Sequence, residues 1–242
     1  MTSIKAVFFD FYNTLARFWP PVEEIQVTAC REIGLSLTRE GVLKGYHVAD
    51  DYFNKENARV SLSGRSEEER EEFFARYEQM VLLGAGMAVT LPLARQVWRL
   101  TTLVPKEFAA FEDAAPALRA LKDKGLILGV ISNINRDIGS MVEKIGLSQY
   151  LDFCVTSREV GAEKPHPSVF MAALRKAGVR PEEAVHVGDQ IYSDVEGART
   201  VGIRPVLIDR QGWHEDMEGV RRVRGLGEVE AVVGAGVNRK PG

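Results

Sequence analysis

The chain of 242 residues lacks the features that mark several specialised classes of protein. It has two cysteines, Cys30 and Cys154, which lie far apart and have no CxxC or His-rich neighbourhood. This spacing favours neither a disulfide framework nor a zinc site, so we expect two reduced packing residues in a cytoplasmic protein. The sequence also has no internal repeats and no low-complexity segment, which leaves an ordinary globular composition.

Hydrophobic runs long enough to span a bilayer are missing as well. The apolar stretch near the N-terminus is short and reaches Asp10 at once, unlike a signal peptide. The 31 Lys and Arg residues are mixed with 34 Asp and Glu residues, which gives a net charge of -3 and no basic stripe. We therefore expect neither a membrane nor a nucleic-acid partner. The protein is expected to be a monomer or a homodimer, and the sequence does not decide between them.

Patterns typical of buried strands alternate with helical patterns in most of the chain. Continuous apolar runs, as expected for buried parallel strands, predict strands at 4–9, 126–131, 153–155, 184–187 and 205–208. Helical patterns, several of which end at a glycine, predict helices at 114–124, 136–145, 168–177 and 193–201. This order predicts an α/β fold with a doubly wound, Rossmann-like parallel sheet.

The alternation lapses after the first strand, where only helical patterns follow one another. Thr38 is typical of an N-cap, and Ser66 with Glu69 forms a capping-box pattern. These signals and the apolar spacing predict four helices, at 22–33, after Thr38, at 67–83 and at 93–100.

This helical block predicts a two-domain organisation. We expect a core formed by residues 1–15 and 107–242, interrupted by a helical cap at 16–106 that could act as a lid over the sheet edge. The hinges are expected at 16–20 and 104–111. Residues 234–242 are Gly-rich and basic, and we interpret them as a tail.

Four groups of polar residues lie at predicted strand ends or in adjoining loops. They are Asp10 with Thr14, Ser132 with Asn133, Lys164 before a helix, and Gly188-Asp189 with Asp194. Each group alone has an ordinary structural explanation, such as a turn or a helix start. In a parallel sheet, however, all four converge on one edge, which is the ligand-binding edge of open α/β folds.

The predicted site would bring three carboxylates, those of Asp10, Asp189 and Asp194, against the single cation Lys164. Carboxylates clustered in this way repel one another, and some would have to bind a proton. A bound divalent cation restores neutrality. Oxygen ligands from so few protein groups favour Mg²⁺, which keeps waters and bridges to a phosphate.

In these motifs and their order the chain resembles the haloacid dehalogenase-like (HAD) hydrolase superfamily, in its helical-cap branch of phosphatases and dehalogenases. The resemblance covers residues 1–15 and about 107–242, and the helical insertion matches the family's usual cap in position. It implies that Asp10 is a nucleophile that forms an aspartyl-phosphate. It also implies that Mg²⁺ binds Asp10, the backbone carbonyl of Tyr12 and Asp189.

The resemblance implies roles for the remaining residues and a small phosphorylated metabolite as substrate. Ser132, with Asn133 or its backbone N–H, would hold phosphate oxygens, and Lys164 would stabilise charge on the transferred group. Asp194 would orient Lys164 or a metal-bound water. Thr14 would order the first loop by hydrogen bonds.

Tyr12 departs from the phosphatase pattern. Phosphatases of the family carry a second aspartate at this position, two residues after the nucleophile, and general acid–base help is worth about 10²–10⁴-fold in rate. Tyrosine there is typical of the family's 2-haloacid dehalogenases, whose halide leaving group needs no proton. Those enzymes need no metal, however, whereas this chain has the metal-binding form with Asp189 and Asp194.

Three functional interpretations remain. The first is a Mg²⁺-dependent phosphohydrolase that prefers leaving groups of low pKa, such as acyl, aryl or anhydride phosphates. The second is a 2-haloacid dehalogenase, which would need a cap arginine for the substrate carboxylate, with Arg31, Arg39 and Arg59 as candidates by location. The third is a catalytically weakened phosphate-binding protein.

Overall fold

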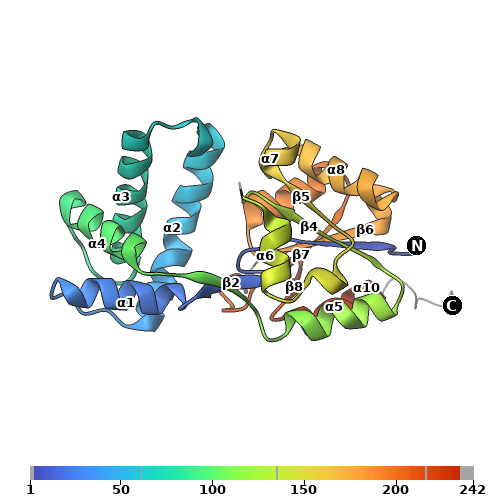
Figure 1. The fold of residues 1–242 in the computed structure, drawn as a ribbon, viewed down its shortest axis with the longest axis horizontal. Coiled ribbons are helices and arrows are strands. Elements are labelled where there is room, and N and C mark those ends of the chain that lie inside the picture. Colours follow the sequence, from blue (N-terminus) through green and yellow to red (C-terminus); the bar gives the residue numbers. More distant parts are fainter. Residues whose placement is uncertain (1–2, 61, 135, 216, 235–242) are drawn as a thin grey trace. The chain divides into compact units, whose positions relative to one another are not determined.

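The computed structural model describes residues 3–60, 62–134, 136–215 and 217–234. The chain falls into two compact units, one formed by Met1–Arg17 with Phe108–Gly242 and the other by Phe18–Glu107 (Figure 1). The tail expected at 234–242 lies outside the described residues, apart from Gly234. That the second unit acts as a lid stays a prediction.

A six-stranded sheet forms the centre of the first unit, in the order β5-β4-β1-β6-β7-β8. Neighbouring strands pair in parallel. The strands are β1 (Ala6–Phe9), β4 (Ile127–Ser132), β5 (Phe153–Thr156), β6 (Ala184–Gly188), β7 (Arg204–Ile208) and β8 (Arg221–Val223). The chain winds outward from β1 through β4 and β5, and then on the other side through β6, β7 and β8. The predicted doubly wound α/β fold is thereby confirmed, and its order reverses at β1, where such folds bind ligands.

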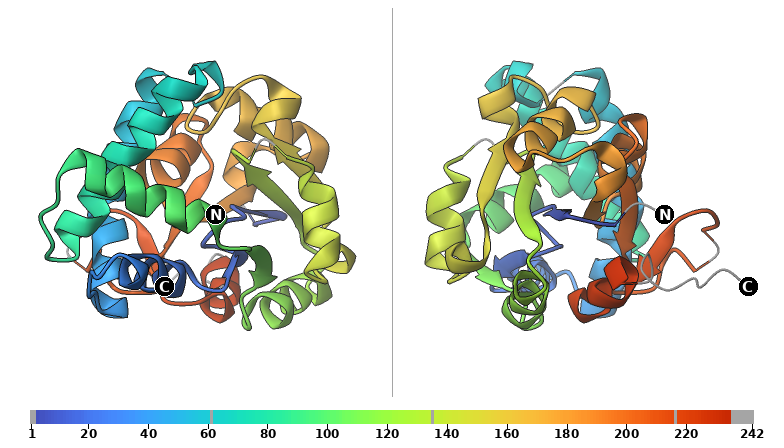
Figure 2. Two further views of the ribbon diagram at one scale, coloured as in Figure 1. Left: turned by 60° about the vertical axis from the view of Figure 1, so that its left-hand side comes forward. Right: turned by 90° about the vertical axis from the view of Figure 1, so that its right-hand side faces the viewer.

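Helices cover both faces of this sheet (Figure 2). Successive side chains of β1 point to opposite faces, and all of them are buried. Val7 and Phe9 pack in a cluster with residues of α5 (Ala114–Asp123), α6 (Ile138–Lys144) and α10 (Val229–Gly234). Ala6 and Phe8 pack with residues of α8 (Pro167–Ala177) and α9 (Gly197–Thr200). Each large side chain buried in this way contributes about 1.5–3 kcal/mol, which holds β1 and the residue that follows it in place.

Four helices make up most of the second unit: α1 (Val22–Glu32), α2 (Arg39–Arg59), α3 (Glu67–Gly84) and α4 (Leu91–Leu103). Both predicted caps are present. The Thr38 side chain accepts a hydrogen bond from the backbone N–H of Gly41, and Ser66 and Glu69 form the reciprocal capping box. Each cap satisfies backbone donors that the first helical turn leaves without a partner, which fixes where α2 and α3 begin.

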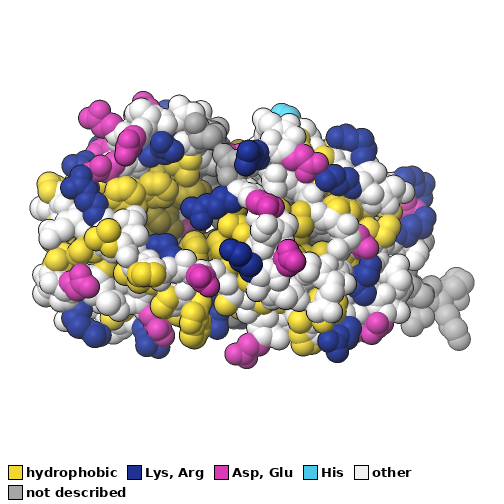
Figure 3. Space-filling model, viewed as in Figure 1, with side chains coloured by type: hydrophobic (Ala, Val, Ile, Leu, Met, Phe, Trp, Pro, Cys, Tyr) yellow, Lys and Arg dark blue, Asp and Glu magenta, His cyan; other side chains and the backbone are white. Residues whose placement is uncertain are grey.

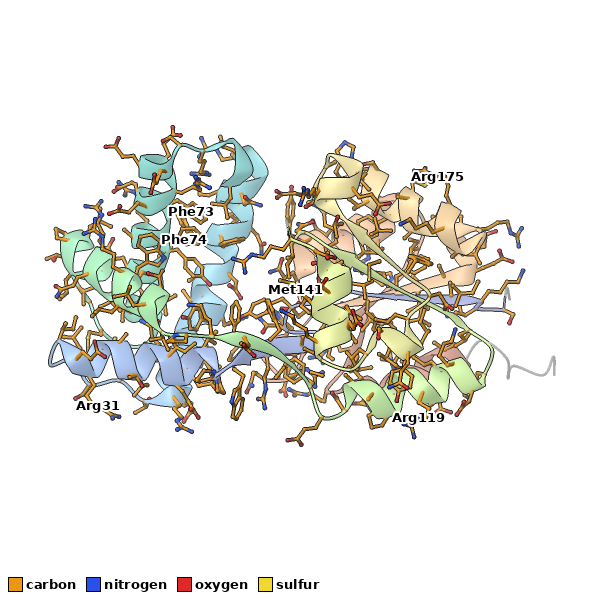
Figure 4. The ribbon with its side chains drawn as sticks, viewed as in Figure 1. Arg31, Phe73, Phe74, Arg119, Met141 and Arg175 are labelled. Carbon is orange, nitrogen blue, oxygen red and sulfur yellow. The ribbon has the colours of Figure 1, made fainter. Side chains whose placement is uncertain are left out.

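Aromatic rings fill the contacts between these helices. Phe73 and Phe74 on α3 (Figure 4) contact neighbouring helices. The ring of Phe73 meets that of Phe53 edge to face at 5.5 Å, and Phe74 stacks on Trp98 at the same separation. The second unit therefore has its own apolar interior.

Several short elements differ from the prediction. The segments expected to be hinges contain two strands that were not predicted, β2 (Ala16–Trp19) and β3 (Glu107–Ala110), which pair in a separate two-stranded sheet. The helix expected at 193–201 begins as a π-helical turn, Ile191–Glu196, and continues as α9. β8, α10 and the short helix α7 (Ser157–Val160) were not predicted. Tertiary contacts, which local sequence patterns do not carry, decide these elements.

Charged side chains of both signs are interspersed on the face shown in Figure 3. Exposed ion pairs include Lys122 with Asp152 at 2.8 Å and Lys124 with Glu230 at 2.9 Å. Because each such pair contributes only about 0–1 kcal/mol, the buried apolar clusters dominate the stability of the first unit. No helix in the described part of the chain is long and apolar enough to cross a membrane.

Candidate active site

Asp10 directly follows β1 at the carboxyl edge of the sheet. Its backbone N–H donates to the carbonyl oxygen of Val187 in β6 at 2.8 Å, which extends the strand pairing by one residue. In the parallel register β1 lies between β4 and β6, so Ser132 at the end of β4 and Asp189 after β6 reach the same edge. The structure therefore brings three of the four predicted motifs to one side of the sheet.

The loop after Asp10 folds back on itself. The backbone N–H of Ala16 donates to the carbonyl oxygen of Phe11 at 2.9 Å, and Asn13 adopts a φ of 61°, a left-handed conformation that asparagine tolerates. The turn buries Thr14 completely and places its hydroxyl 3.4 Å from a carboxylate oxygen of Asp189. Thr14 thus links the first loop to the fourth motif.

Lys164 lies between two of the predicted carboxylates. Its ammonium is 2.5 Å from Oδ1 of Asp10 and 2.6 Å from Oδ1 of Asp194, and the lysine side chain is only 3% exposed. Carboxylate oxygens of Asp10, Asp189 and Asp194 lie within 4.8 Å of one another. All four charged residues predicted from the sequence therefore meet in one cluster.

Burial and neighbouring charges push the two buried carboxylates in opposite directions. Burial raises the pKa of Asp10 to about 6, although the Lys164 ammonium opposes the rise. Burial would also raise the pKa of Asp194, but the charge of Lys164 and a hydrogen bond from His186 outweigh it and hold that pKa well below its usual range. Burial lowers the pKa of Lys164, and the charges of Asp10 and Asp194 more than reverse this. The Asp194–Lys164 pair therefore stays ionised, and at Asp10 the effect of burial outweighs that of the ammonium.

Asp194 is held by several donors. Its Oδ2 accepts from the backbone N–H of Gln190 at 3.1 Å, and its Oδ1 lies 2.9 Å from Nε2 of His186. Burial lowers the pKa of His186 despite this contact, so the imidazole is neutral at pH 7. Gly188 gives the carboxylate room, because a Cβ there would lie 2.2 Å from Cγ of Asp194.

Ser132 and Asn133 occupy the end of β4 and the residue after it. The Ser132 hydroxyl accepts from the backbone N–H of Ile134 at 3.2 Å. The Asn133 side chain makes two hydrogen bonds to the backbone of Lys164: its Oδ1 accepts from the N–H at 2.6 Å, and its Nδ2 donates to the carbonyl at 3.0 Å. Because both ends of the Asn133 amide are engaged, its side chain fixes the loop that carries Lys164.

The Tyr12 ring packs against Phe108, with centroids 6.1 Å apart in an edge-to-face arrangement. Tyr12 also forms an isolated backbone bridge with Ala16. The ring of Tyr12 is thus packed against an aromatic neighbour.

His186 was not predicted as a site residue. It lies inside β6, where the sequence Ala184–Gly188 otherwise reads as a buried apolar strand. The sequence offers one indication of such a role, which is that a histidine interrupts an apolar run two residues before Gly188. Only the structure shows that it reaches Asp194.

The donor set fits a hard divalent cation. Three carboxylates against one ammonium leave two negative charges uncompensated, and every candidate ligand atom is oxygen. Mg²⁺ takes oxygen ligands and uses few carboxylates, while cations that prefer sulfur or nitrogen would find no such donor in this cluster. Asp10, Asp189 and Asp194 could therefore hold a metal ion of this kind.

Known proteins resemble the chain over most of its length. A family model described as haloacid dehalogenase-like hydrolase matches residues 4–202. Human haloacid dehalogenase-like hydrolase domain-containing protein 3 is 29% identical over 206 residues, 85% of this chain and 82% of the relative. Ribulose-1,5-bisphosphate 5-phosphatase of Halopiger xanaduensis is 29% identical over 209 residues, 84% of each. The solved structure of a 2-haloacid dehalogenase from Pseudomonas syringae is similar with a TM-score of 0.57 and 24% identity, covering 97% of this chain and 100% of that one.

Proposed function

The chain belongs to the haloacid dehalogenase-like hydrolase family, and we propose that it is a magnesium-dependent phosphohydrolase for small phosphorylated metabolites. The observation that carries the proposal is the cluster of Asp10, Asp189 and Asp194, in which the Lys164 ammonium contacts Asp10 and Asp194. An anionic nucleophile can approach an anionic phosphate only if nearby positive charge offsets their repulsion. The Halopiger xanaduensis relative, whose name is that of a phosphatase, supports this assignment.

Asp10, the backbone carbonyl of Tyr12 and Asp189 would hold the Mg²⁺ ion. When bound, the cation would neutralise charge on the nucleophile and on the phosphate. Thr14, through its hydrogen bond to Asp189, would keep the first loop and the fourth motif together.

Asp10 would act as the nucleophile in two half-reactions. In the first, a carboxylate oxygen of Asp10 attacks phosphorus, and the bond from phosphorus to the leaving oxygen breaks with its electron pair on that oxygen. In the second, water attacks the same phosphorus, its proton passes to solvent, and phosphate leaves the regenerated Asp10. Lys164 stabilises the charge on the transferred group, while the Ser132 hydroxyl and the Asn133 backbone N–H bind its oxygens.

The residue at position 12 would set the range of leaving groups. A tyrosine whose ring packs on Phe108 is a poor replacement for a carboxylic acid, because a phenol has a pKa of about 10. A leaving group that departs as a stable anion needs no such acid. We therefore expect acyl, aryl and anhydride phosphates to be hydrolysed faster than alkyl phosphates.

A 2-haloacid dehalogenase is the second candidate, and Tyr12 is the observation that favours it. Asp189 and Asp194 argue against it, because a cation beside Asp10 would withdraw electron density from a nucleophile that must attack carbon. Similarity to a solved dehalogenase at 24% identity supports the fold alone.

Hydrolysis of a substrate panel tests the proposal. The panel is acetyl phosphate, p-nitrophenyl phosphate and 2-chloropropionate, each with magnesium and with EDTA, for the wild type and Asp10→Asn. We expect phosphate release that needs both magnesium and Asp10. Chloride release that survives EDTA, or no phosphate release from acetyl phosphate, would contradict it.

A further inference from the structure

His186 is completely buried on the face of the sheet that packs against α8 and α9. The parallel register pairs it with Phe8 of β1, and its ring meets that of Phe170 in α8 with centroids 5.2 Å apart. Apolar side chains fill this layer, so an apolar residue would satisfy packing at this position. An imidazole here loses the hydration of both ring nitrogens, which needs a specific compensation.

One ring nitrogen of His186 has that compensation. Nε2 lies 2.9 Å from Oδ1 of Asp194, whereas Nδ1 is buried and has no hydrogen-bond partner among the described residues. Because a carboxylate oxygen accepts, Nε2 carries the proton and donates. His186 thus leaves its Nδ1 buried without a hydrogen bond within the described part of the chain, while its Nε2 donates one hydrogen bond to Asp194.

The oxygen that receives this N–H also holds the lysine. Oδ1 of Asp194 accepts from Lys164 Nζ at 2.6 Å, and Oδ2 accepts from the backbone N–H of Gln190 at 3.1 Å. With His186, three donors converge on one carboxylate and fix its rotation. Lys164 Nζ also lies 2.5 Å from Oδ1 of Asp10, so the orientation of Asp194 decides where the ammonium stands beside Asp10.

We infer that His186 is a positioning residue, which acts through Asp194 to keep the Lys164 ammonium beside the Asp10 carboxylate. The inference rests on the proposed function, in which Lys164 stabilises the transferred group. His186 and Lys164 donate to the same oxygen of Asp194. The imidazole N–H therefore weakens the attraction of that oxygen for the ammonium, which leaves the ammonium beside Asp10. Loss of the imidazole N–H should therefore affect the step in which charge develops, more than the binding of substrate.

Two substitutions of His186 test this role. His186→Leu keeps the packing volume and removes the donor, whereas His186→Gln places an amide N–H the same number of bonds from Cβ. With acetyl phosphate and magnesium we expect His186→Leu to lower kcat by about 10- to 100-fold, as is typical of groups that orient catalytic residues. KM should change by less than about threefold, because ground-state binding is retained. His186→Gln should recover most of the lost kcat.

Phe170→Leu is the matched control, because it disturbs the same layer and the contact with the imidazole ring without removing the N–H. It should lower Tm while kcat stays within about twofold of the wild type. A folded His186→Leu variant with wild-type kcat would overturn the inference. So would a Phe170→Leu variant that loses as much kcat as His186→Leu, because packing would then carry the effect.

The side-chain ¹H–¹⁵N resonance of Lys164 gives a readout that does not depend on turnover. We expect it to shift in His186→Leu and to return toward the wild-type position in His186→Gln. If the wild type releases no phosphate but this resonance responds as expected, the proposed function fails and the positioning role stands. If phosphate is released but the resonance is the same in all three proteins, the positioning role fails alone.

Discussion

Asp10 and Asp194 both contact the Lys164 ammonium, yet their surroundings give them different chemistry. Asp194 accepts three hydrogen bonds, from His186, Gln190 and Lys164, which hold its charge in place. Burial dominates at Asp10 and raises its pKa to about 6. A carboxylate held by three donors suits support of the Lys164 ammonium, while one at which burial outweighs that ammonium gains from a bound metal ion. Their surroundings thus agree with the different roles that the sequence predicts for the two aspartates.

Gly188 tests how closely Asp194 must fit. A Cβ on residue 188 would lie 2.2 Å from Cγ of Asp194, so Gly188→Ala has to displace that carboxylate and loosen Lys164. We expect kcat for acetyl phosphate to fall by about 10²-fold or more, the usual loss when a fixed electrostatic group is misplaced. Gly227→Ala, at a position with open space, is the control and should stay fully active. Wild-type kcat in a folded Gly188→Ala protein would show that catalysis does not depend on the position of the Asp194 carboxylate.

The crossing of α2 and α3 depends on two glycines. A Cβ on Gly45 would lie 2.1 Å from the backbone oxygen of Val81, and one on Gly84 would lie 2.8 Å from Cα of Gly45. Backbone atoms cannot move aside as a flexible side chain does. The helices can therefore approach this closely only because residues 45 and 84 have no side chain.

Gly45→Ala should destabilise the second unit by about 2 kcal/mol or more, because the added methyl forces two packed helices apart. Thermal unfolding followed by circular dichroism measures the effect. Gly64→Ala, in the same unit but with no atom near the added Cβ, should leave Tm nearly unchanged. Equal Tm values for the two variants would mean that α2 and α3 accommodate the added methyl group without loss of stability.

Glu78 on α3 makes the stability of the second unit depend on pH. It is 3% exposed and accepts a hydrogen bond from Gln26, and burial raises its pKa from 4.5 to about 7. As the pH rises from 4.5, the unfolded chain loses this proton before the folded one does. The stability due to Glu78 is therefore complete below about pH 4.5 and is lost by about pH 7, a change of roughly 3 kcal/mol.

Glu78→Gln keeps an acceptor for Gln26 and removes the titration. Denaturant unfolding at pH 5 and pH 8 should show a smaller loss of stability on raising the pH than in the wild type, and a more stable protein at pH 8. Glu68→Gln, at an exposed position on the same helix, should leave the pH dependence unchanged. An unaltered difference between the two pH values in Glu78→Gln would contradict the assignment.

Across the whole molecule, the sequence predicts best what local patterns determine. Continuous apolar runs predicted five of the six strands of the sheet, and Ser66 and Glu69 predicted the start of α3. The cluster of Asp10, Lys164 and Asp194 was also predictable, because parallel strands place their carboxyl ends on one edge. These predictions rest on rules that connect the order of residues in the sequence directly to their place in the fold.

The features that the sequence could not predict depend on contacts between distant residues. His186 looks like an ordinary position in β6 until the π-helical turn returns Asp194 to it. That the Asn133 side chain pairs with the backbone of Lys164, 31 residues away, was not predicted either. The β2–β3 pair also forms between segments far apart in the chain. No local pattern carries such information.

The most direct test of the account is where an oxygen atom from water goes during turnover. Acetyl phosphate is hydrolysed with magnesium in H₂¹⁸O, and mass spectrometry examines the phosphate, the acetate and the peptide that contains Asp10. If Asp10 attacks phosphorus, water attacks phosphorus in turn, so the label enters phosphate and neither Asp10 nor acetate. The same labelling is done in a parallel reaction with 2-chloropropionate. Turnover of 2-chloropropionate with label in the Asp10 carboxylate would contradict the proposed function. In that case Asp10 attacks the substrate carbon to form an ester, and water then attacks the aspartyl carbon of this ester.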